Sequence, residues 1–358
     1  MNSFFQHLID LNDYPVSWWN KIISLGHDIS KNPDRYNGAC NGKIMATLFY
    51  EPSTRTQMSF QSAMIRLGGS IIGFDNPATS SVSKGENLKD TTKIVSNYAD
   101  IMIIRHPLEG TAKAAALSSD CPVINAGDGG HLHPTQTLTD LLTLTEEKGR
   151  LDNLTIGLCG DLRNGRTVHS LCKALSCYEN NKFILISTKE LKLPSYIKDI
   201  LKAKGCQFTE VNSLEDTISN LDVLYMTRIQ KERFASEQEY FSQKDVYILD
   251  KNKMKFAKKD LVVLHPLPRV DEISVDVDED SRALYFKQAK YGMYVRMSLI
   301  ITMLENKEPC RLLLGNTIKN QKCTNQKCIT NSEQYLPKTF ISSGDIIECE
   351  YCDERILI

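Results

Sequence analysis

One segment, Lys43 to Gly69, constrains the fold of this chain more than any other; it reads KIMATLFYEPSTRTQMSFQSAMIRLGG. The first half, from Ile44 to Tyr50, is an apolar run with the length of a buried strand. The second half carries apolar residues at helical spacing, namely Phe60, Ala63, Met64 and Leu67. A strand that passes directly into a helix is typical of a parallel α/β sheet, so the segment predicts that fold class.

The junction between this strand and helix has the composition of a phosphate-binding turn. It offers the hydroxyls of Ser53, Thr54 and Thr56 and the guanidinium of Arg55, with Ser53 at the expected N-cap. Backbone N–H groups and the helix dipole favour an anion at a helix N-terminus, and a guanidinium suits phosphate oxygens. An ordinary capped helix with a solvated Arg55 explains these six residues equally well. The choice between the two interpretations therefore depends on the other loops of the chain.

Composition limits the classes of protein that the chain can belong to. Its 358 residues suffice for two domains and a small third. A net charge of −1 lacks the basic excess of nucleic-acid and membrane-surface proteins. No apolar stretch is long enough for a membrane span and the N-terminal sequence lacks the pattern of a secretion signal, so we expect a cytoplasmic protein. Free thiols best explain the cysteines without metal-binding spacing: Cys40, Cys121, Cys159, Cys172, Cys177, Cys206 and Cys310.

Strands and helices alternate through the first half of the chain. A helical pair is expected within residues 4–30, with Ser17 as the cap of its second helix. Further strands are expected at 70–74, 101–104 and 122–125, and helices at 88–98 and 111–119. Ligands bind at the carboxyl ends of parallel strands, where the loops of Ser53, Arg105 and His133 would gather. Residues 75–86 are expected to form a flexible loop, and the local sequence alone favours a solvated surface residue for its Lys84.

A second series of strands begins after a domain boundary that we place within residues 147–152. Strands are expected at 154–159, 183–187, 221–226 and 261–264, and helices at 137–148, 196–204 and 285–304. The turn at 160–166 lacks the G-x-G-x-x-G spacing, which argues against NAD binding. Polar loops follow two later strands, at 227–233 and 265–269, and the acidic stretch 271–280 is expected to be a solvated loop.

The composition changes after Glu305. Cys323 and Cys328 form a C-x4-C pair, and Cys349 and Cys352 form a C-x2-C pair. Two such pairs joined by a β-rich linker match a structural zinc site with four thiolate ligands. A metal-free quartet of reduced thiols is the alternative, but so small a segment hardly folds without a metal or disulfides. Because the protein supplies all four ligands, we expect a closed site that carries out no chemistry.

Six motifs occur in order along the chain, namely FYEPSTRTQMSFQSAMIRLGG, SVSKGE, HPTQ at 133–136, GDLRNGRTVHS at 160–170, TRIQKER at 227–233 and HPLPR at 265–269. This ordered set resembles that of aspartate carbamoyltransferase catalytic chains over about residues 1–305. The tail resembles the zinc domain of that enzyme's regulatory chain. It is fused without the regulatory chain's nucleotide-binding domain, because residues 306–321 leave no room for one, so we expect no nucleotide feedback at the usual regulatory site.

The resemblance implies two doubly wound parallel-sheet domains and a small C-terminal β-rich domain. The first is a carbamoyl phosphate-binding domain at 1–148, onto which the helix 285–304 packs back, and the second is an aspartate-binding domain at 149–284. The third, at 306–358, holds a structural Zn²⁺ on Cys323, Cys328, Cys349 and Cys352. No organic cofactor is implied.

The resemblance also implies the reaction, which transfers the carbamoyl group of carbamoyl phosphate to the amine of L-aspartate, an early step of de novo pyrimidine biosynthesis. It assigns the phosphate group to Ser53, Thr54, Arg55 and Thr56. It assigns the carbonyl oxygen to Thr56, Arg105 and His133, and the carbamoyl amide to Gln136, Leu267 and Pro268. It assigns the carboxylates of aspartate to Arg166, Arg228 and Gln230. Lys84, with Ser80 or Ser81, is implied to reach both substrates from the neighbouring subunit of a homotrimer, which the zinc domain could join into a dimer of trimers.

Two alternatives remain at this level. Ornithine carbamoyltransferases share the phosphate turn, but their late loop usually reads His-Cys-Leu-Pro where this chain has His265-Pro266-Leu267-Pro268, and Arg228 suits a carboxylate better than an ammonium group. A catalytically inactive scaffold that binds a partner through its zinc domain would have no need of the intact set of polar residues. One departure from many relatives is Ser83 beside Lys84, where they carry two adjacent lysines.

Overall fold

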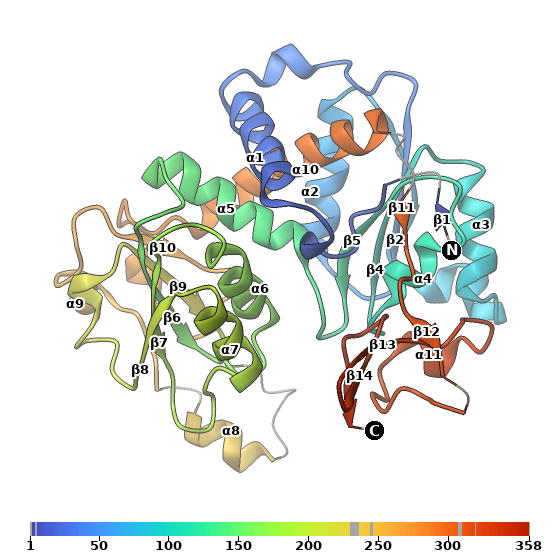
Figure 1. Ribbon diagram of the computed structural model, residues 1–358. Coiled ribbons are helices and arrows are strands. Elements are labelled where there is room, and N and C mark those ends of the chain that lie inside the picture. The colour runs from blue at the N-terminus through green and yellow to red at the C-terminus, as the bar shows by residue number, and fades with distance from the viewer. Residues whose placement is uncertain are drawn as a thin grey trace. The chain divides into compact units, whose positions relative to one another are not determined.

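A computed structural model describes residues 2–3, 6–229, 236–243, 246–306, 310–318 and 320–357 of the chain (Figure 1). The chain divides into two compact units. The first, called unit 1 below, consists of Met1–Thr135 and Met293–Ile358, and the second, unit 2, is Gln136–Gly292. No helix in these described ranges is long and apolar enough to cross a membrane.

Unit 1 is built on a four-stranded parallel sheet in the order β3-β2-β4-β5. The strands are β2 (Ile44–Phe49), β3 (Ser70–Phe74), β4 (Ile101–His106) and β5 (Val123–Asp128). The helices are α1 (Val16–Lys31), α2 (Thr54–Arg66), α3 (Leu88–Ser96), α4 (Thr111–Ala116) and the second half of α10 (Tyr285–Glu305). The expected passage from strand to helix is confirmed, and Phe60, Ala63, Met64 and Leu67 are all buried.

The prediction of two N-terminal α-helices was wrong. The described residues up to Lys31 contain one α-helix. Leu11–Asp13 is a short 3-10 turn, capped by the Asp10 side chain, which accepts a hydrogen bond from the Asn12 N–H. The α-helix begins at Val16 with Pro15 as its N-cap, so Ser17 lies inside the first turn. Pro15 is compatible with the N-cap position because its backbone there is extended and because an N-cap N–H group has no partner within the helix.

The loop at 75–86 has local structure that the sequence analysis did not predict. It contains two 3-10 turns, Pro77–Thr79 and Ser81–Lys84. The side chains of Asn76 and Ser80 accept hydrogen bonds from the backbone N–H groups of Ala78 and Val82. Short Asn and Ser side chains commonly stabilise such turns, because their oxygens reach the backbone two residues further on.

Unit 2 contains a five-stranded parallel sheet in the order β10-β9-β6-β7-β8. The strands are β6 (Thr155–Gly160), β7 (Lys182–Ile186), β8 (Gln207–Val211), β9 (Val223–Thr227) and β10 (Val262–Leu264). The helices are α5 (Pro134–Lys148), α6 (Arg166–Leu175), α7 (Ser195–Ala203), α8 (Glu237–Gln243), α9 (Lys251–Met254) and the first half of α10. The stretch 271–280 is not simply a solvated loop, because Ile273 and Val277 are buried and Asp278 binds Arg269.

The C-terminal residues form a small antiparallel sheet in the order β12-β13-β14-β15. Its strands are β12 (Asn316–Thr317), β13 (Thr339–Ser343), β14 (Ile346–Cys349) and β15 (Arg355–Leu357), with the short helix α11 (Ile329–Ser332). Upstream, β11 (Cys310–Arg311) pairs with the N-terminal β1 (Asn2–Ser3). We refer to residues 310–357 as the C-terminal module, which is part of unit 1.

Candidate active site and metal centre

The turn that the sequence predicts to bind phosphate lies at the carboxyl end of β2, where α2 begins. Ser53 occupies the N-cap position, but its side chain makes no capping hydrogen bond. Thr54 and Arg55 are exposed in the first turn, whereas Thr56 is buried. A Ser at the N-cap whose hydroxyl does not cap the helix leaves first-turn N–H groups for another acceptor, as an anion site requires.

Arg105 lies beside this turn, at the carboxyl end of the neighbouring strand. Residues Phe49 and Arg105 are paired across β2 and β4. The guanidinium is mostly buried, 2.7 Å from the Glu51 carboxylate and 3.2 Å from the Ala126 carbonyl oxygen. Its buried Nε atom has no hydrogen-bond partner among the described residues. Burial lowers the pKa of Arg55, and the nearby charge of Arg105 lowers it further, so two guanidinium groups converge at this edge.

His133 completes the polar edge of unit 1. It is buried and follows β5, directly before α5. Its Nδ1 atom is 3.4 Å from the Thr135 hydroxyl, which lies 3.5 Å from Arg296 Nη2. Arg296 also donates to Ser59 of α2 at 3.1 Å. Arg296 therefore ties the His133 segment to the helix that carries Thr54, Arg55 and Thr56.

Lys84, Ser80 and Ser81 lie at the edge strand β3 rather than in the polar cluster. Lys84 is exposed at the end of its 3-10 turn and makes no hydrogen bond or ion pair with the part of the chain described. Ser80 donates to the Pro77 carbonyl at 2.8 Å, while Ser81 is exposed. Lys84 is therefore accessible on the surface of the single chain.

The edge of unit 2 gathers three polar loops at the carboxyl ends of neighbouring strands. Arg166 starts α6 after β6, Arg228 follows β9, and His265 follows β10. Gly160 and Thr227 are paired at the ends of β6 and β9, so the loops of Arg166 and Arg228 leave from adjacent points. Both arginines are half-buried. Gln230 lies outside the described residues.

Two further candidates of unit 2, Gln136 and Leu267, are held by buried polar groups. Gln136 donates to Asp140 Oδ1 at 2.8 Å, and the Leu267 N–H donates to His265 Nδ1 at 2.7 Å. Leu267 has a φ of +53°, in the left-handed region, and precedes Pro268 through a cis peptide bond. Asp140 was not predicted from the sequence, although Gln and Asp four residues apart on one helix are a recognisable pair.

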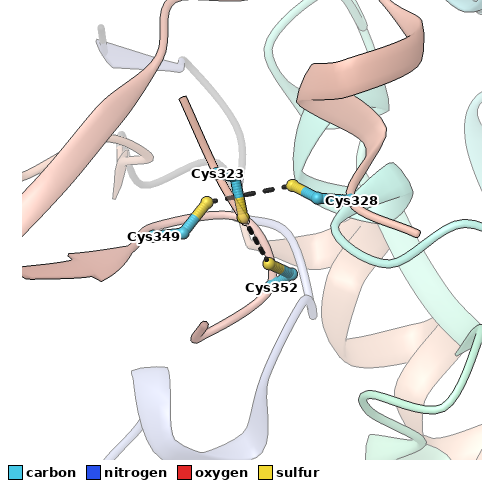
Figure 2. A group of neighbouring side chains, drawn as sticks. All are labelled: Cys323, Cys328, Cys349 and Cys352. Carbon is cyan, nitrogen blue, oxygen red and sulfur yellow. Dashed lines mark hydrogen bonds between the residues drawn. The ribbon is translucent and has the colours of Figure 1, made fainter. Parts of the chain in front are cut away.

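The four cysteines of the C-terminal module lie together (Figure 2). All are buried, and their Sγ atoms lie within 4.8 Å of one another. The Cys323–Cys352 and Cys328–Cys349 sulfur distances are 3.5 and 3.8 Å. A Zn–S bond of about 2.3 Å gives a tetrahedron with edges of about 3.8 Å. The thiols therefore fit a structural Zn²⁺ with four protein ligands, as the sequence predicted; the other seven cysteines are also free.

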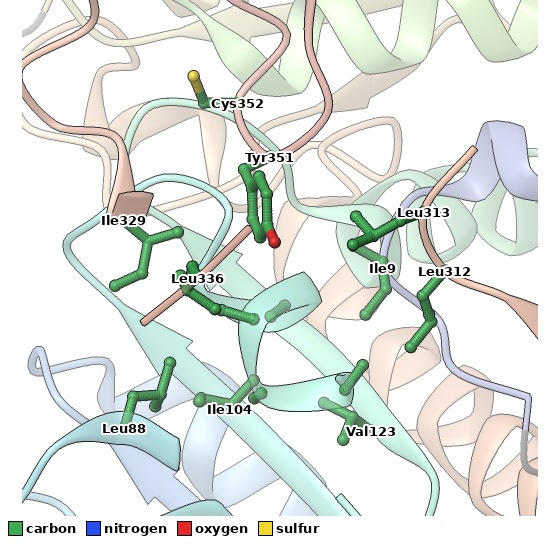
Figure 3. Close-up of a cluster of buried hydrophobic side chains, with 14 of the residues drawn as sticks. Ile9, Leu88, Ile104, Val123, Leu312, Leu313, Ile329, Leu336, Tyr351 and Cys352 are labelled. Carbon is green, nitrogen blue, oxygen red and sulfur yellow. The ribbon is translucent and has the colours of Figure 1, made fainter. Parts of the chain in front are cut away.

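The C-terminal module shares a hydrophobic core with the sheet of unit 1 (Figure 3). Leu88, Ile104 and Val123 lie in one cluster with Leu313, Ile329, Leu336 and Tyr351. At Gly110, with a φ of +82°, a Cβ atom would lie 2.5 Å from Tyr351 Cβ, so only glycine permits this close approach. The module is therefore a part of the fold of unit 1 rather than an appended tail.

Polar contacts connect the module to the segment that leads into His133. Glu109 accepts hydrogen bonds from Asn325 of the module at 2.6 Å and from the Gly130 N–H at 3.2 Å. His131 lies between Asp128 and Asp353 of the module, with a nitrogen 3.0 Å from each carboxylate. Burial alone would lower the pKa of His131, but these two carboxylates raise it well above its usual value. Sequence analysis found none of these contacts.

Comparison with known proteins agrees with this geometry. Residues 6–146 match the family model "Aspartate/ornithine carbamoyltransferase, carbamoyl-P binding domain", and residues 152–303 match the corresponding "Asp/Orn binding domain". The aspartate carbamoyltransferase catalytic subunit of Clostridium perfringens strain SM101 is 62% identical over 300 residues, which is 84% of this chain and 98% of that protein. The chain belongs to the aspartate carbamoyltransferase family.

Other aspartate carbamoyltransferases support the same assignment. The catalytic subunit of Finegoldia magna is 60% identical over 299 residues, 84% of this chain and 98% of that protein. The solved catalytic subunit of M. jannaschii superimposes with a TM-score of 0.79 at 47% identity, covering 84% of this chain and 98% of that one. The Trypanosoma cruzi aspartate transcarbamoylase, solved with carbamoyl phosphate and aspartate, gives 0.78 at 37% identity, with 83% and 96% covered.

The C-terminal module matches a model of a different chain of the aspartate carbamoyltransferase system. Residues 318–357 match "Aspartate carbamoyltransferase regulatory chain, metal binding domain". This match and the close spacing of the four sulfurs agree on a structural Zn²⁺ site. The fusion of a regulatory-type zinc domain to a catalytic chain is thereby confirmed.

Proposed function

We propose that the two polar edges divide the substrates of the family's reaction between them. The reaction is the transfer of the carbamoyl group from carbamoyl phosphate to the amine of L-aspartate, which yields N-carbamoyl-L-aspartate and phosphate. Unit 1 binds the phosphate and the carbonyl oxygen, and unit 2 binds the carbamoyl amide and aspartate. The observation that carries this division is the convergence of Arg55 and the buried Arg105 beside an N-terminus whose Ser53 hydroxyl does not cap it.

In unit 1, the helix start and Arg55 hold the phosphate group. Ser53, Thr54 and Thr56 add hydroxyl donors at the same turn. Arg105, Thr56 and His133 donate to the carbonyl oxygen of the carbamoyl group. Negative charge grows on that oxygen and on the leaving phosphate as the amine attacks, so fixed donors aimed at both lower the barrier. The unpartnered Nε of Arg105 supports this role because a buried guanidinium N–H without an acceptor is costly.

In unit 2, Arg166, Arg228 and Gln230 bind the two carboxylates of aspartate. A guanidinium binds a carboxylate through two parallel hydrogen bonds, which an ammonium-bearing substrate such as ornithine could not offer at that point. The adjacent departure of the Arg166 and Arg228 loops from β6 and β9 supports the pairing of these two residues. Gln136, Leu267 and Pro268 bind the carbamoyl amide.

Complete sites require a homotrimer in which Lys84, with Ser80 or Ser81, reaches the substrates of the neighbouring subunit. The exposure of Lys84 in the single chain supports this arrangement. The enzyme acts in the cytoplasm, and the domains span 1–148, 149–284 and 306–358. Zn²⁺ supports the fold of the C-terminal domain and takes no part in the reaction.

Mixed trimers test the shared site. Lys84→Ala and Arg105→Ala are each expected to lower kcat by about 100-fold or more, since each removes a donor to the reacting groups. When the two inactive variants are dissociated, mixed and reassociated, some sites receive an intact Lys84 from one subunit and an intact Arg105 from the other. Recovered activity in the mixture supports the shared site, and a mixture of confirmed hybrid trimers as inactive as its parents contradicts it.

A further inference from the structure

Asp140 lies at the centre of a buried hydrogen-bond network in unit 2 that the reaction does not itself require. Its side chain is completely buried on α5. One carboxylate oxygen, Oδ1, accepts hydrogen bonds from Gln136 Nε2 at 2.8 Å and from Gln288 Nε2 at 2.6 Å. Burying a carboxylate costs free energy unless hydrogen bonds compensate for the lost hydration. The burial of Asp140 therefore suggests a specific role for this residue.

The network fixes the orientation of the Gln136 and Gln288 side-chain amides, that is, which side carries the oxygen and which the NH₂ group. Gln288 Oε1 accepts from the His265 backbone N–H at 3.0 Å, so its NH₂ group has to face Asp140. Gln136 also directs its NH₂ group to Asp140. Because a carboxylate accepts hydrogen bonds and an amide oxygen would be repelled by it, Gln136 Oε1 points away from Asp140. The amide of Gln136 thus presents an acceptor to whatever lies on its other side.

The turn at Leu267 and Pro268 has no backbone N–H group left to donate to a ligand. The Leu267 N–H is used by His265 Nδ1 at 2.7 Å, and proline has no N–H. His265 Nε2 is 2.7 Å from Glu272 Oε1, which fixes the tautomer with its proton on Nε2 and the lone pair on Nδ1. The polar backbone groups that remain at these two residues are carbonyl oxygens, which only accept.

We propose that Asp140 is a positioning residue that makes the carbamoyl-amide site accept hydrogen bonds only, and thereby selects a substrate with an NH₂ group over one with a methyl group. This inference rests on the proposed function, which assigns the carbamoyl amide to Gln136, Leu267 and Pro268. Asp140 acts through Gln136 and, by way of Gln288 and His265, through Leu267. A site built to pair with substrate N–H groups rejects an analogue that lacks them, because its own polar groups are then left unpaired.

The test compares carbamoyl phosphate with acetyl phosphate, in which a methyl group replaces the NH₂ group. Steady-state kinetics give the KM for carbamoyl phosphate, and inhibition against that substrate gives the Ki of acetyl phosphate. In Asp140→Leu, we expect KM to rise about 10-fold or more and Ki to change less than about twofold, so that the ratio of Ki to KM falls about 10-fold. Asp140→Asn keeps an oxygen that accepts from both glutamines and is expected to retain most of the ratio.

Two further variants separate positioning from general stability. Asp222→Leu is the matched control, because it removes another carboxylate of unit 2, one that accepts from the Thr155 N–H at 2.8 Å and pairs with Lys258. It is expected to lower Tm without changing the ratio. Gln288→Met breaks the link between Asp140 and His265 with little change in volume, and it is expected to lower the ratio even if Asp140→Leu does not fold.

The outcomes are distinct. An unchanged ratio in folded, active Asp140→Leu or Gln288→Met protein overturns the inference while leaving the proposed function intact. An equal fall in Asp222→Leu also overturns it, because the effect would then be one of stability. Wild-type protein that forms no N-carbamoyl-L-aspartate would overturn the proposed function, and this inference with it.

Discussion

Among individual residues, His7 and His106 of unit 1 each accept a hydrogen bond from a backbone N–H group. His7 Nδ1 accepts from the Val123 N–H at 3.1 Å, and His106 Nδ1 accepts from the Leu108 N–H at 3.0 Å. Burial lowers the pKa of each to about 4. A lone pair that accepts a backbone hydrogen bond is lost on protonation, so both residues make unit 1 sensitive to acid.

For His7 we predict a loss of stability as the pH falls. Its folded pKa of about 4 lies below the ordinary 6.5, so the unfolded chain takes up a proton first as the pH falls below 6.5 and stability is lost. Between pH 7.5 and pH 5, wild-type protein should lose about 2 kcal/mol more unfolding free energy than His7→Asn, whose amide oxygen can replace Nδ1. Urea unfolding of both proteins at both pH values measures the difference. Parallel pH profiles would contradict the assignment of acid sensitivity to His7.

At the residue scale, the sequence could name the proposed substrate-binding groups but not the residues that hold them in place. Arg55, Arg105, His133, Arg166 and Arg228 all lie at or shortly after the carboxyl ends of parallel strands, where ligands bind in this class of fold. Their roles came from the resemblance to a family. Their partners, such as Glu51 beside Arg105 or Gln288 beside Asp140, depend on packing between distant segments. No local pattern marks such a pair, with the exception of Gln136 and Asp140 on one helix face.

Among the elements, the paired carboxyl ends of β6 and β9 leave no room for a side chain at Gly160. Gly160 has a φ of +120°, and a Cβ atom there would lie 2.2 Å from the Thr227 carbonyl oxygen. The loops of Arg166 and Arg228 begin at these two strand ends. The separation of the two arginines therefore depends on a position that only glycine can fill.

Gly160→Ala tests this dependence, with Gly205→Ala as its control. Gly205 has a φ of +72° but open space around it, so its substitution causes backbone strain of about 1 kcal/mol without a collision. We expect Gly160→Ala to lower the unfolding free energy by at least about 2 kcal/mol and to raise the KM for aspartate more than the KM for carbamoyl phosphate. Gly205→Ala should leave both KM values unchanged. Equal kinetic effects in the two variants would show that the strand ends do not set the arginine geometry.

The elements with strong apolar patterns were predictable, and the weakly patterned ones were not. β2, β4 and β6 are buried runs of apolar residues, and α2 and α10 show helical spacing, so each appeared where it was expected. β8 (Gln207–Val211) was missed because this edge strand is largely exposed and polar. The first N-terminal helix was wrongly expected, because a short segment that begins with its own Asp10 cap and ends before Pro15 forms only a 3-10 turn.

In the molecule as a whole, the zinc centre supports more than its own module. The buried cysteines belong to the same hydrophobic cluster as Ile104 and Val123 of the unit 1 sheet. Asn325 of the module donates to Glu109, and Asp353 of the module pairs with His131. Both contacts lie close to the segment that leads to His133. Loss of the metal should therefore disturb unit 1 beyond the module.

Zinc removal tests this coupling. Binding of structural Zn²⁺ stabilises a small domain by about 10 kcal/mol or more, so zinc-free protein should show a much lower Tm for unit 1 in calorimetry and recover it when Zn²⁺ is added back. Cys328→Ser should reproduce the loss, while Cys310→Ser, a half-buried cysteine outside the quartet, should not. The KM for carbamoyl phosphate should rise in zinc-depleted protein that remains folded. Metal-free protein, verified by elemental analysis, with an unchanged Tm would refute the structural role.

The proposed function is tested by incubating purified, zinc-replete protein with carbamoyl phosphate and either L-aspartate or L-ornithine and quantifying the carbamoylated products. We expect N-carbamoyl-L-aspartate and phosphate in equal amounts from the first mixture and no product from the second. Product from ornithine would contradict the roles given to Arg166 and Arg228. No product from either mixture, in protein of confirmed trimeric mass, would contradict the proposed function as a whole.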